Sequence, residues 1–137
     1  MLYVLITFVV LLFLNIYCAK ACQNLFYNSK KSTMIELCHI AAGNVADLEV
    51  LNEATISQAV TGLTDSDNTR IIVTDESNMA IYDTANIISV EEQHLLYPEI
   101  VKALEGNNIF HWTYQDGAML SYAAVPVVSY GTLVGCI

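Results

Sequence analysis

The chain has 137 residues, of which 55% are hydrophobic, and its formal charge is −9 at pH 7. This length suffices for one membrane anchor and one modest domain, because single domains typically contain about 100 to 150 residues. Five basic residues stand against fourteen acidic ones. Such a balance cannot form the cationic stripe that binds phosphates, so we exclude nucleic acid as a partner.

The amino terminus carries a long uncharged segment. Residues 2–19 contain no charged side chain, and a helix over them would measure about 27 Å, close to the roughly 30 Å hydrocarbon core of a bilayer. Tyr3 and Tyr17 lie near its two ends, where aromatic rings favour the membrane interface, and Lys20 ends the run. We therefore predict that residues 1–20 form a single transmembrane helix in the cell membrane, with the lipid bilayer as a partner.

A cleaved signal peptide is the alternative interpretation of this segment. Ala19-Lys20-Ala21 has the small-x-small pattern of a cleavage site, and Cys22 follows it. Cleavage there would leave a secreted or lipid-anchored binding protein. The segment lacks a basic region at its start, and its apolar run is longer than that of most signal peptides, so we favour the anchor.

A membrane-proximal helical segment is predicted over residues 21–63, because apolar residues recur at intervals of three and four. Gly43 weakens its middle and allows a bend there. The apolar stripe is longer than a small sheet needs to cover it, so both a homodimer contact and packing within one chain stay open. The stripe consists of Met34, Leu37, Cys38, Ala41, Val45, Leu48 and Leu51.

Beyond a polar breaker at residues 64–68, the pattern changes from helical to extended. Residues 70–74 and 80–82 are rich in β-branched and aromatic side chains and flank turn-forming residues, which predicts a hairpin. A helix is expected next. Ser89 and Glu92 have capping-box spacing at its start, Pro98 restarts it, and Gly106 closes it.

The last third of the chain is again typical of strands. Phe110, Trp112 and Tyr114 alternate before an Asp116-Gly117 turn, and two further extended runs cover residues 119–128 and 132–137. Pro126 is expected at a sheet edge or a bulge, because it cannot donate a ladder hydrogen bond. The predicted fold is α+β: the transmembrane helix continues into a long helix, which packs on a five-stranded antiparallel PAS-like sheet over residues 64–137.

The sequence offers almost no recognisable site chemistry. It has no glycine-rich phosphate loop and no nucleophile elbow, and its three histidines lack zinc-ligand spacing. Asp65, Asp67 and Asp75 lack the glycine and the bidentate glutamate of a calcium loop. We predict no catalytic residue, no metal and no cofactor in this chain. The disulfide state of three cysteines stays open at this point: Cys22, Cys38 and Cys136.

Five pieces of the sequence, taken in order, resemble the extracytoplasmic PAS-like (Cache-type) sensor domain of membrane sensor histidine kinases. The resemblance covers nearly the whole chain after the amino-terminal span and long helix. Its pieces are Arg70-Ile71-Ile72-Val73-Thr74-Asp75, Ile81-Tyr82-Asp83-Thr84, Pro98-Glu99-Ile100-Val101-Lys102-Ala103-Leu104-Glu105-Gly106, Ala123-Ala124-Val125-Pro126-Val127 and Gly131-Thr132-Leu133-Val134-Gly135.

The resemblance implies that the chain is the input region of a two-component receptor. The domain would lie outside the cytoplasm, although Lys20, Lys30 and Lys31 after the span favour the opposite topology by the positive-inside rule. A kinase core that uses ATP and acts on a response regulator would follow, so the chain is expected to be truncated at its carboxyl end and to work as a homodimer. Input domains of this kind also occur on chemoreceptors and cyclases, which remain alternatives.

The resemblance further implies a ligand pocket over the sheet, lined by Tyr82, His111, Trp112 and Tyr122. Alternation along a strand puts His111 and Trp112 on opposite faces, so at most one of the two lines the pocket. Arg70 and Lys102 are the two cations of the sheet domain. A strongly anionic ligand would lack partners there, so we expect a neutral or cationic ligand, or direct sensing of the membrane without a pocket.

Overall fold

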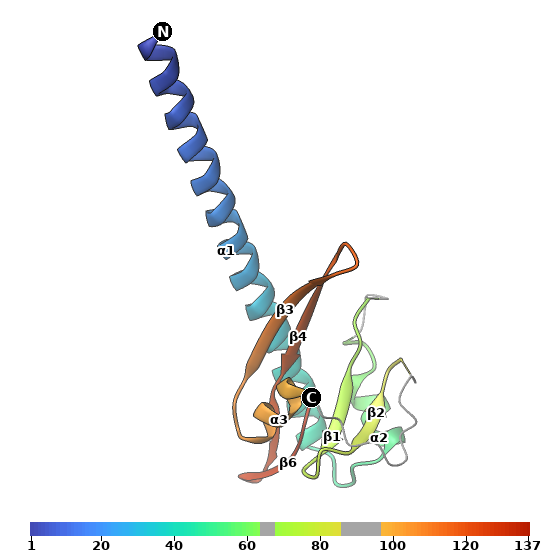
Figure 1. Ribbon diagram of the computed structural model, residues 1–137. Helices are drawn as coiled ribbons and strands as arrows, with labels where there is room; N and C mark the ends of the chain where they lie inside the picture. Colours follow the sequence, from blue (N-terminus) through green and yellow to red (C-terminus); the bar gives the residue numbers. More distant parts are fainter. Residues whose placement is uncertain (64–67, 86–96) are drawn as a thin grey trace. The chain divides into compact units, whose positions relative to one another are not determined.

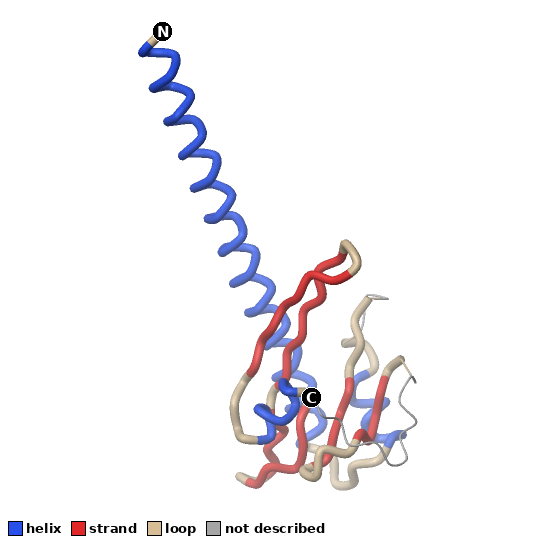
Figure 2. Tube along the Cα trace, viewed as in Figure 1, coloured by secondary structure: helices blue, strands red, loops and turns tan. Residues whose placement is uncertain are grey.

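The computed structural model describes residues 1–63, 68–85 and 97–137, and it divides into two compact units, Met1–Thr33 and Met34–Ile137 (Figure 1). Three helices and six strands lie in the described residues (Figure 2). The helices are α1 (Leu2–Ala46), α2 (Glu53–Val60) and α3 (Pro98–Leu104). The strands are β1 (Ile72–Asp75), β2 (Ala80–Asp83), β3 (Ile109–Gln115), β4 (Ala118–Ala124), β5 (Pro126–Ser129) and β6 (Thr132–Cys136).

The first unit is helical throughout and carries the apolar segment. The sequence has no glycine or proline before Gly43, so nothing in it interrupts a helix. The most apolar window of α1 has a mean hydropathy of 2.4 and is 0% buried. The helix is thus long and apolar enough to cross a membrane, as predicted, and a signal sequence at this position would meet the same criterion.

The helical segment predicted over residues 21–63 is interrupted, which the sequence pattern did not indicate. Helix α1 ends at Ala46 and α2 begins after Asn52. Asn52 Oδ1 accepts a hydrogen bond from Thr55 N at 2.9 Å, and Thr55 Oγ1 accepts one from Asn52 N at 3.2 Å. This reciprocal cap satisfies amides that a new helix start would leave unpaired. Gly43, where a bend was considered, lies within α1.

The second unit contains a four-stranded antiparallel sheet with the order β2-β1-β6-β5. The predicted hairpin over residues 70–82 is confirmed as β1 and β2. Asp75 Oδ1 accepts hydrogen bonds from Ser77 N at 2.9 Å and Met79 N at 2.8 Å, and Asn78 has a φ of 67°. The carboxylate and an asparagine in the left-handed region together stabilise this turn.

Strands β3 and β4 form a separate two-stranded sheet, so the predicted five-stranded sheet is wrong. The chain turns between them at Asp116 and Gly117, whose φ values are 52° and 79°. The extended run that follows divides at Val125, which exchanges backbone hydrogen bonds of 2.8 and 3.0 Å with Ile137. Its first part pairs with β3 and its second part, β5, pairs with β6. Pro126 lies on β5 at the edge of the four-stranded sheet, as predicted.

Two further predictions concern the segment before the last strands. Pro98 occupies the first turn of α3, and Gly106 follows the helix with a φ of 91°, which confirms both ends of that part of the predicted helix. The proposed capping box at Ser89 and Glu92, and residues 64–67 of the polar breaker, lie outside the described residues.

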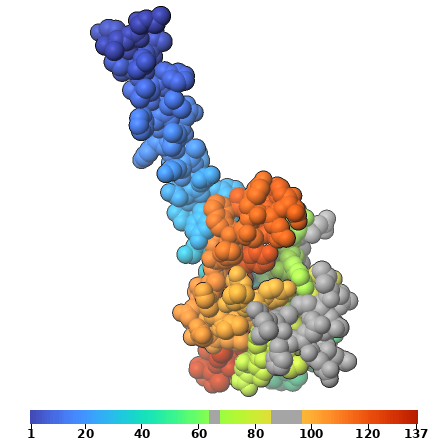
Figure 3. Space-filling model, in the orientation of Figure 1, coloured from blue at the N-terminus to red at the C-terminus, as the bar shows by residue number. Residues whose placement is uncertain are grey.

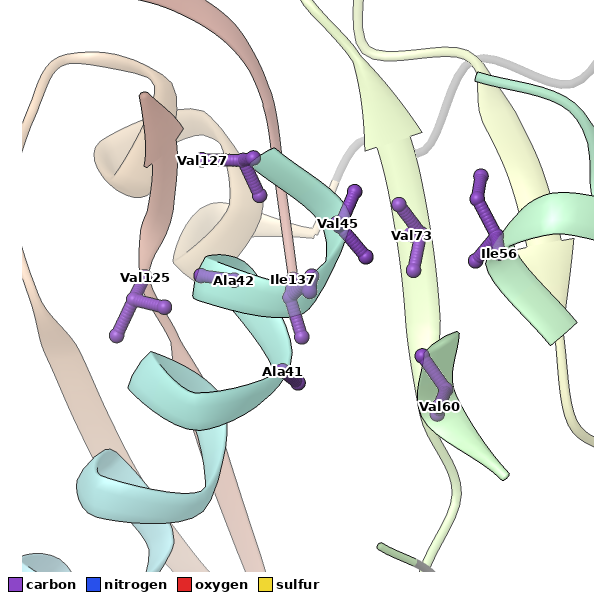
Figure 4. Close-up of a cluster of buried hydrophobic side chains, with 9 residues drawn as sticks. All are labelled: Ala41, Ala42, Val45, Ile56, Val60, Val73, Val125, Val127 and Ile137. Carbon is purple, nitrogen blue, oxygen red and sulfur yellow. The ribbon is translucent and has the colours of Figure 1, made fainter. Parts of the chain in front are cut away.

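Helices cover both faces of the four-stranded sheet, because neighbouring residues of a strand point in opposite directions. On one face a first core joins α1 and α2 to the sheet (Figure 4). On the other face a second core joins the sheet to α3. The first core consists of Ala41, Ala42, Val45, Ile56, Val60, Val73, Val125, Val127 and Ile137. The second consists of Ala80, Ile100, Ala103, Ala124 and Cys136.

Candidate functional site

Tyr82 is the predicted site residue that lines a cavity. It lies on β2 opposite Val73 of the first core, and therefore on the face that α2 covers. An open depression of about 480 Å³ separates it from the first turn of α2. The other lining residues are Asn52, Glu53, Ala54 and Ser57. The depression thus offers one aromatic ring, one carboxylate and two small polar side chains.

The position of this depression differs from the one the resemblance implies. A pocket between the sheet and the helix that connects its strands would lie on the α3 side, whereas Tyr82 packs with the first core on the α2 side. The first turn of α2 contributes most of the lining residues, and these the sequence reading missed. A signal was available, since Asn52 and Thr55 have the spacing of a helix cap, but residues 21–63 were read as one helical segment.

His111 and Tyr122 are brought together on the β3–β4 hairpin, where they lie directly opposite each other. Their rings stack with centroids 6.4 Å apart and an interplanar angle of 22°. Trp112 pairs with Ser121 and therefore lies on the opposite face of the hairpin, as strand alternation predicted. The four predicted site residues therefore occupy three places: the depression, and each face of the hairpin.

The strongest electrostatic contact in the second unit joins Arg70 to Asp83. Arg70 Nε and Nη2 donate to the two carboxylate oxygens of Asp83 at 2.9 and 2.7 Å. The Asp83 side chain is 0% exposed and Arg70 is 34% exposed. The hydrogen bonds to Asp83 raise the pKa of Arg70 above its usual value. Such a two-point ion pair holds its cation in place, so Arg70 is committed to the fold.

The four cysteines are free, and two of them lie inside the second unit. Burial, with a smaller contribution from Cys136, raises the pKa of Cys38 to about 11. Burial also raises the pKa of Cys136, whose Sγ lies 3.2 Å from Thr74 Oγ1. Cys38 packs against the first core and Cys136 belongs to the second, so the sheet separates them. Protonated, buried thiols of this kind are chemically inert.

No group of three or more histidine, cysteine or acidic side chains is placed to hold a metal ion within the three described ranges. Nor do we find a nucleophile next to a positioned base among the printed contacts of those ranges. The arrangement can therefore bind a small molecule or a surface by shape, aromatic contact and one carboxylate. Chemistry that needs an activated nucleophile has no support in the described residues.

Comparison with models of known protein families gives no match, and no curated protein matches the chain.

Proposed function

We propose that this chain is the signal-sensing input region of a two-component sensor histidine kinase, which passes an extracytoplasmic signal to a kinase core. The observation that carries the proposal is the role of α1. This helix contains the apolar segment, and its last turns supply Ala41, Ala42 and Val45 to the first core. A change in packing of the sheet would then act directly on the helix that reaches the membrane.

The lack of site chemistry supports a sensor over an enzyme, since an input domain needs only two packed states and a signal that distinguishes them. The separate β3–β4 sheet departs from a five-stranded PAS-like sheet, yet the order of elements along the chain agrees with the resemblance. ATP, the response regulator and the kinase chemistry belong in this proposal to the core that follows. The same input region on a chemoreceptor or a cyclase is the runner-up.

A homodimer is part of the proposal, and the structure refines where it would form. The stripe residues Cys38, Ala41 and Val45 pack within their own domain. Leu37 and Ile40 remain 38% and 46% exposed on α1. These two apolar side chains, which lie off the core-facing positions, are the ones we assign to contact with a second copy.

The membrane topology tests the proposal, because a sensor of this class needs its domain outside the cytoplasm. In a chain with Cys18→Ser and Cys22→Ser, the remaining thiols of Cys38 and Cys136 are shielded. Tyr130→Cys then places one fully exposed thiol on the turn between β5 and β6. We expect a membrane-impermeant maleimide to label this thiol in intact cells.

The matched control is the same chain without Tyr130→Cys, which should stay unlabelled before and after permeabilisation. Labelling of Tyr130→Cys that appears only after the membrane is permeabilised would place the domain in the cytoplasm and overturn the sensor proposal as stated. A mature chain that begins at Cys22 would instead favour the lipid-anchored binding protein.

A further inference from the structure

The outer half of the β3–β4 hairpin exposes large apolar side chains. Tyr114 is 75% exposed, Met119 44%, Leu120 40% and Tyr122 41%. In the space-filling view the hairpin, coloured orange, forms a projecting part of the visible surface (Figure 3). Soluble proteins seldom leave such side chains together at one end of a hairpin, and groups of this kind mark contact surfaces.

These side chains lie on both faces of the hairpin. Tyr114 and Met119 are direct partners in the register, so they share one face. Leu120 and Tyr122 point to the other face, where Tyr122 stacks on His111. A single protein partner would cover one face of a two-stranded ribbon. Apolar residues on both faces fit a surrounding layer, which contacts the ribbon from all sides.

The charge of this region is also unlike that of the rest of the chain. Residues 106–137 contain one formally charged side chain, Asp116, whereas the whole chain carries −9. Aromatic and apolar side chains with little charge favour the boundary between lipid headgroups and acyl chains. Attraction to anionic lipids would need lysine and arginine, which this hairpin lacks.

Contacts within the second unit give the direction of the hairpin. Cys38 Sγ lies 3.9 Å from the carbonyl oxygen of Ala123, and Ser129 Oγ donates to the carbonyl of Ala46 at 2.9 Å. The run from β4 to β5 therefore follows α1 in the same chain direction. Going backwards from Ala123, the strand leads to the turn, and going backwards from Cys38, the helix leads to the apolar segment.

The lengths involved are compatible with a contact at the membrane. The turn at Gly117 lies six residues before Ala123, which is about 20 Å along a strand. Residues 20–37 separate the apolar segment from Cys38, and a helix of that length measures about 27 Å. The difference is similar to the thickness of one headgroup layer.

We infer that the outer half of the β3–β4 hairpin lies in the headgroup layer of the bilayer that α1 crosses, with Tyr114, Met119 and Leu120 as its contacts. The inference rests on the membrane anchorage within the proposed function, and it does not depend on the kinase. Contact is made by aromatic and apolar side chains, so it is independent of lipid charge and of salt.

Trp112 is the single tryptophan of the chain, and it lies on this hairpin. The full chain is placed in phosphatidylcholine nanodiscs that contain lipids spin-labelled either at the headgroup or deep in the acyl chain. We expect the headgroup label to quench tryptophan emission several times more strongly than the deep label. Moving the reporter outward with Trp112→Phe and Tyr114→Trp should increase this quenching, because position 114 is nearer the turn.

A double variant, Met119→Ser with Leu120→Ser, should reduce the quenching at least twofold, while Tyr130→Ser and Val128→Ser remove exposed apolar surface elsewhere and should leave it unchanged. Circular dichroism checks that each variant is folded. Replacing a third of the lipid by phosphatidylglycerol, or raising the salt to 0.5 M, should have no effect.

Two results would overturn the inference. One is tryptophan emission that no labelled lipid quenches while the chain stays in the bilayer after carbonate washing, which would leave the anchorage itself intact. The other is emission that responds to two chains per disc and not to the label, which would assign the hairpin surface to a second copy. Release of the chain by carbonate would refute the anchorage and this contact together.

Discussion

Single residues determine how tightly the strands of the second unit approach. A Cβ built on Gly135 would collide with the backbone oxygen of Thr74 on the neighbouring strand β1. The sequence reading predicted a close backbone approach from this glycine, and the structure confirms it. The ion pair of Arg70 and Asp83 could not be predicted in this way, because 13 positions separate its members. Only the pairing of β1 with β2 brings them together.

Replacing Gly135 by alanine tests this close approach. We expect Gly135→Ala to lower the free energy of unfolding of the segment 34–137 by about 1 to 3 kcal/mol, the usual cost of overpacking, because β1 and β6 must move apart. Urea unfolding followed by circular dichroism measures the change.

Gly43 supplies the matched control. It lies inside α1 and has open space around its Cα, so Gly43→Ala should raise the free energy of unfolding by about 0.5 to 1 kcal/mol. Equal effects of the two substitutions would show that the contact between Gly135 and Thr74 is not as described.

At the scale of elements, the sequence identified the hairpin of β1 and β2, the end of α3 and the turn at Asp116 and Gly117. These features depend on local turn chemistry, which a sequence displays directly. It failed where pairing at a distance decides. The run over residues 118–129 is uniformly extended in its pattern, and only the bonds of Val125 to Ile137 divide it between two sheets. No local signal distinguishes one long strand from two short ones.

The cap of α2 provides a test at this scale, because it also shapes the depression beside Tyr82. Asn52→Ala removes the side-chain acceptor of the Thr55 amide, so we expect a loss of about 1 kcal/mol in the free energy of unfolding. Asn52→Asp keeps the acceptor and should retain most of the stability. An alanine variant as stable as the aspartate variant would contradict the assigned cap.

For the whole molecule, composition and the apolar segment predicted an anchored α+β protein, and the structure confirms that coarse description. The position of the depression was not predictable, because it depends on α2 and on which face of the sheet Tyr82 occupies. Three of the four predicted site residues lie on a hairpin whose separation from the main sheet has no sequence signal. The aromatic residues were found, but their grouping was not.

The charges near the depression predict which ligands the second unit accepts. Arg70 is held by Asp83, and the depression itself contributes the carboxylate of Glu53. We expect di- and tricarboxylates such as citrate to leave the melting temperature of the segment 34–137 unchanged. A cationic ligand found in a thermal-shift screen should stabilise it, through the carboxylate and the ring of Tyr82.

The variant Glu53→Gln distinguishes binding at the depression from binding elsewhere. It should abolish the stabilisation by a cationic ligand while leaving the melting temperature of the free segment nearly unchanged, since Glu53 is exposed. Marked stabilisation of the unaltered segment by tricarboxylates would show that the charge argument is wrong.

The passage of one chain from β4 to β5 gives the hairpin a mechanical role. Between the two sheets the chain is held at Val125 by its two bonds to Ile137, and Pro126 follows immediately. A force applied to the turn at Gly117 is therefore transmitted along β4 to one fixed point inside the first core. Any tilt of the hairpin rotates about that point. Val125 thus acts as a fulcrum, and the hairpin is the long arm of a lever whose short arm moves β5.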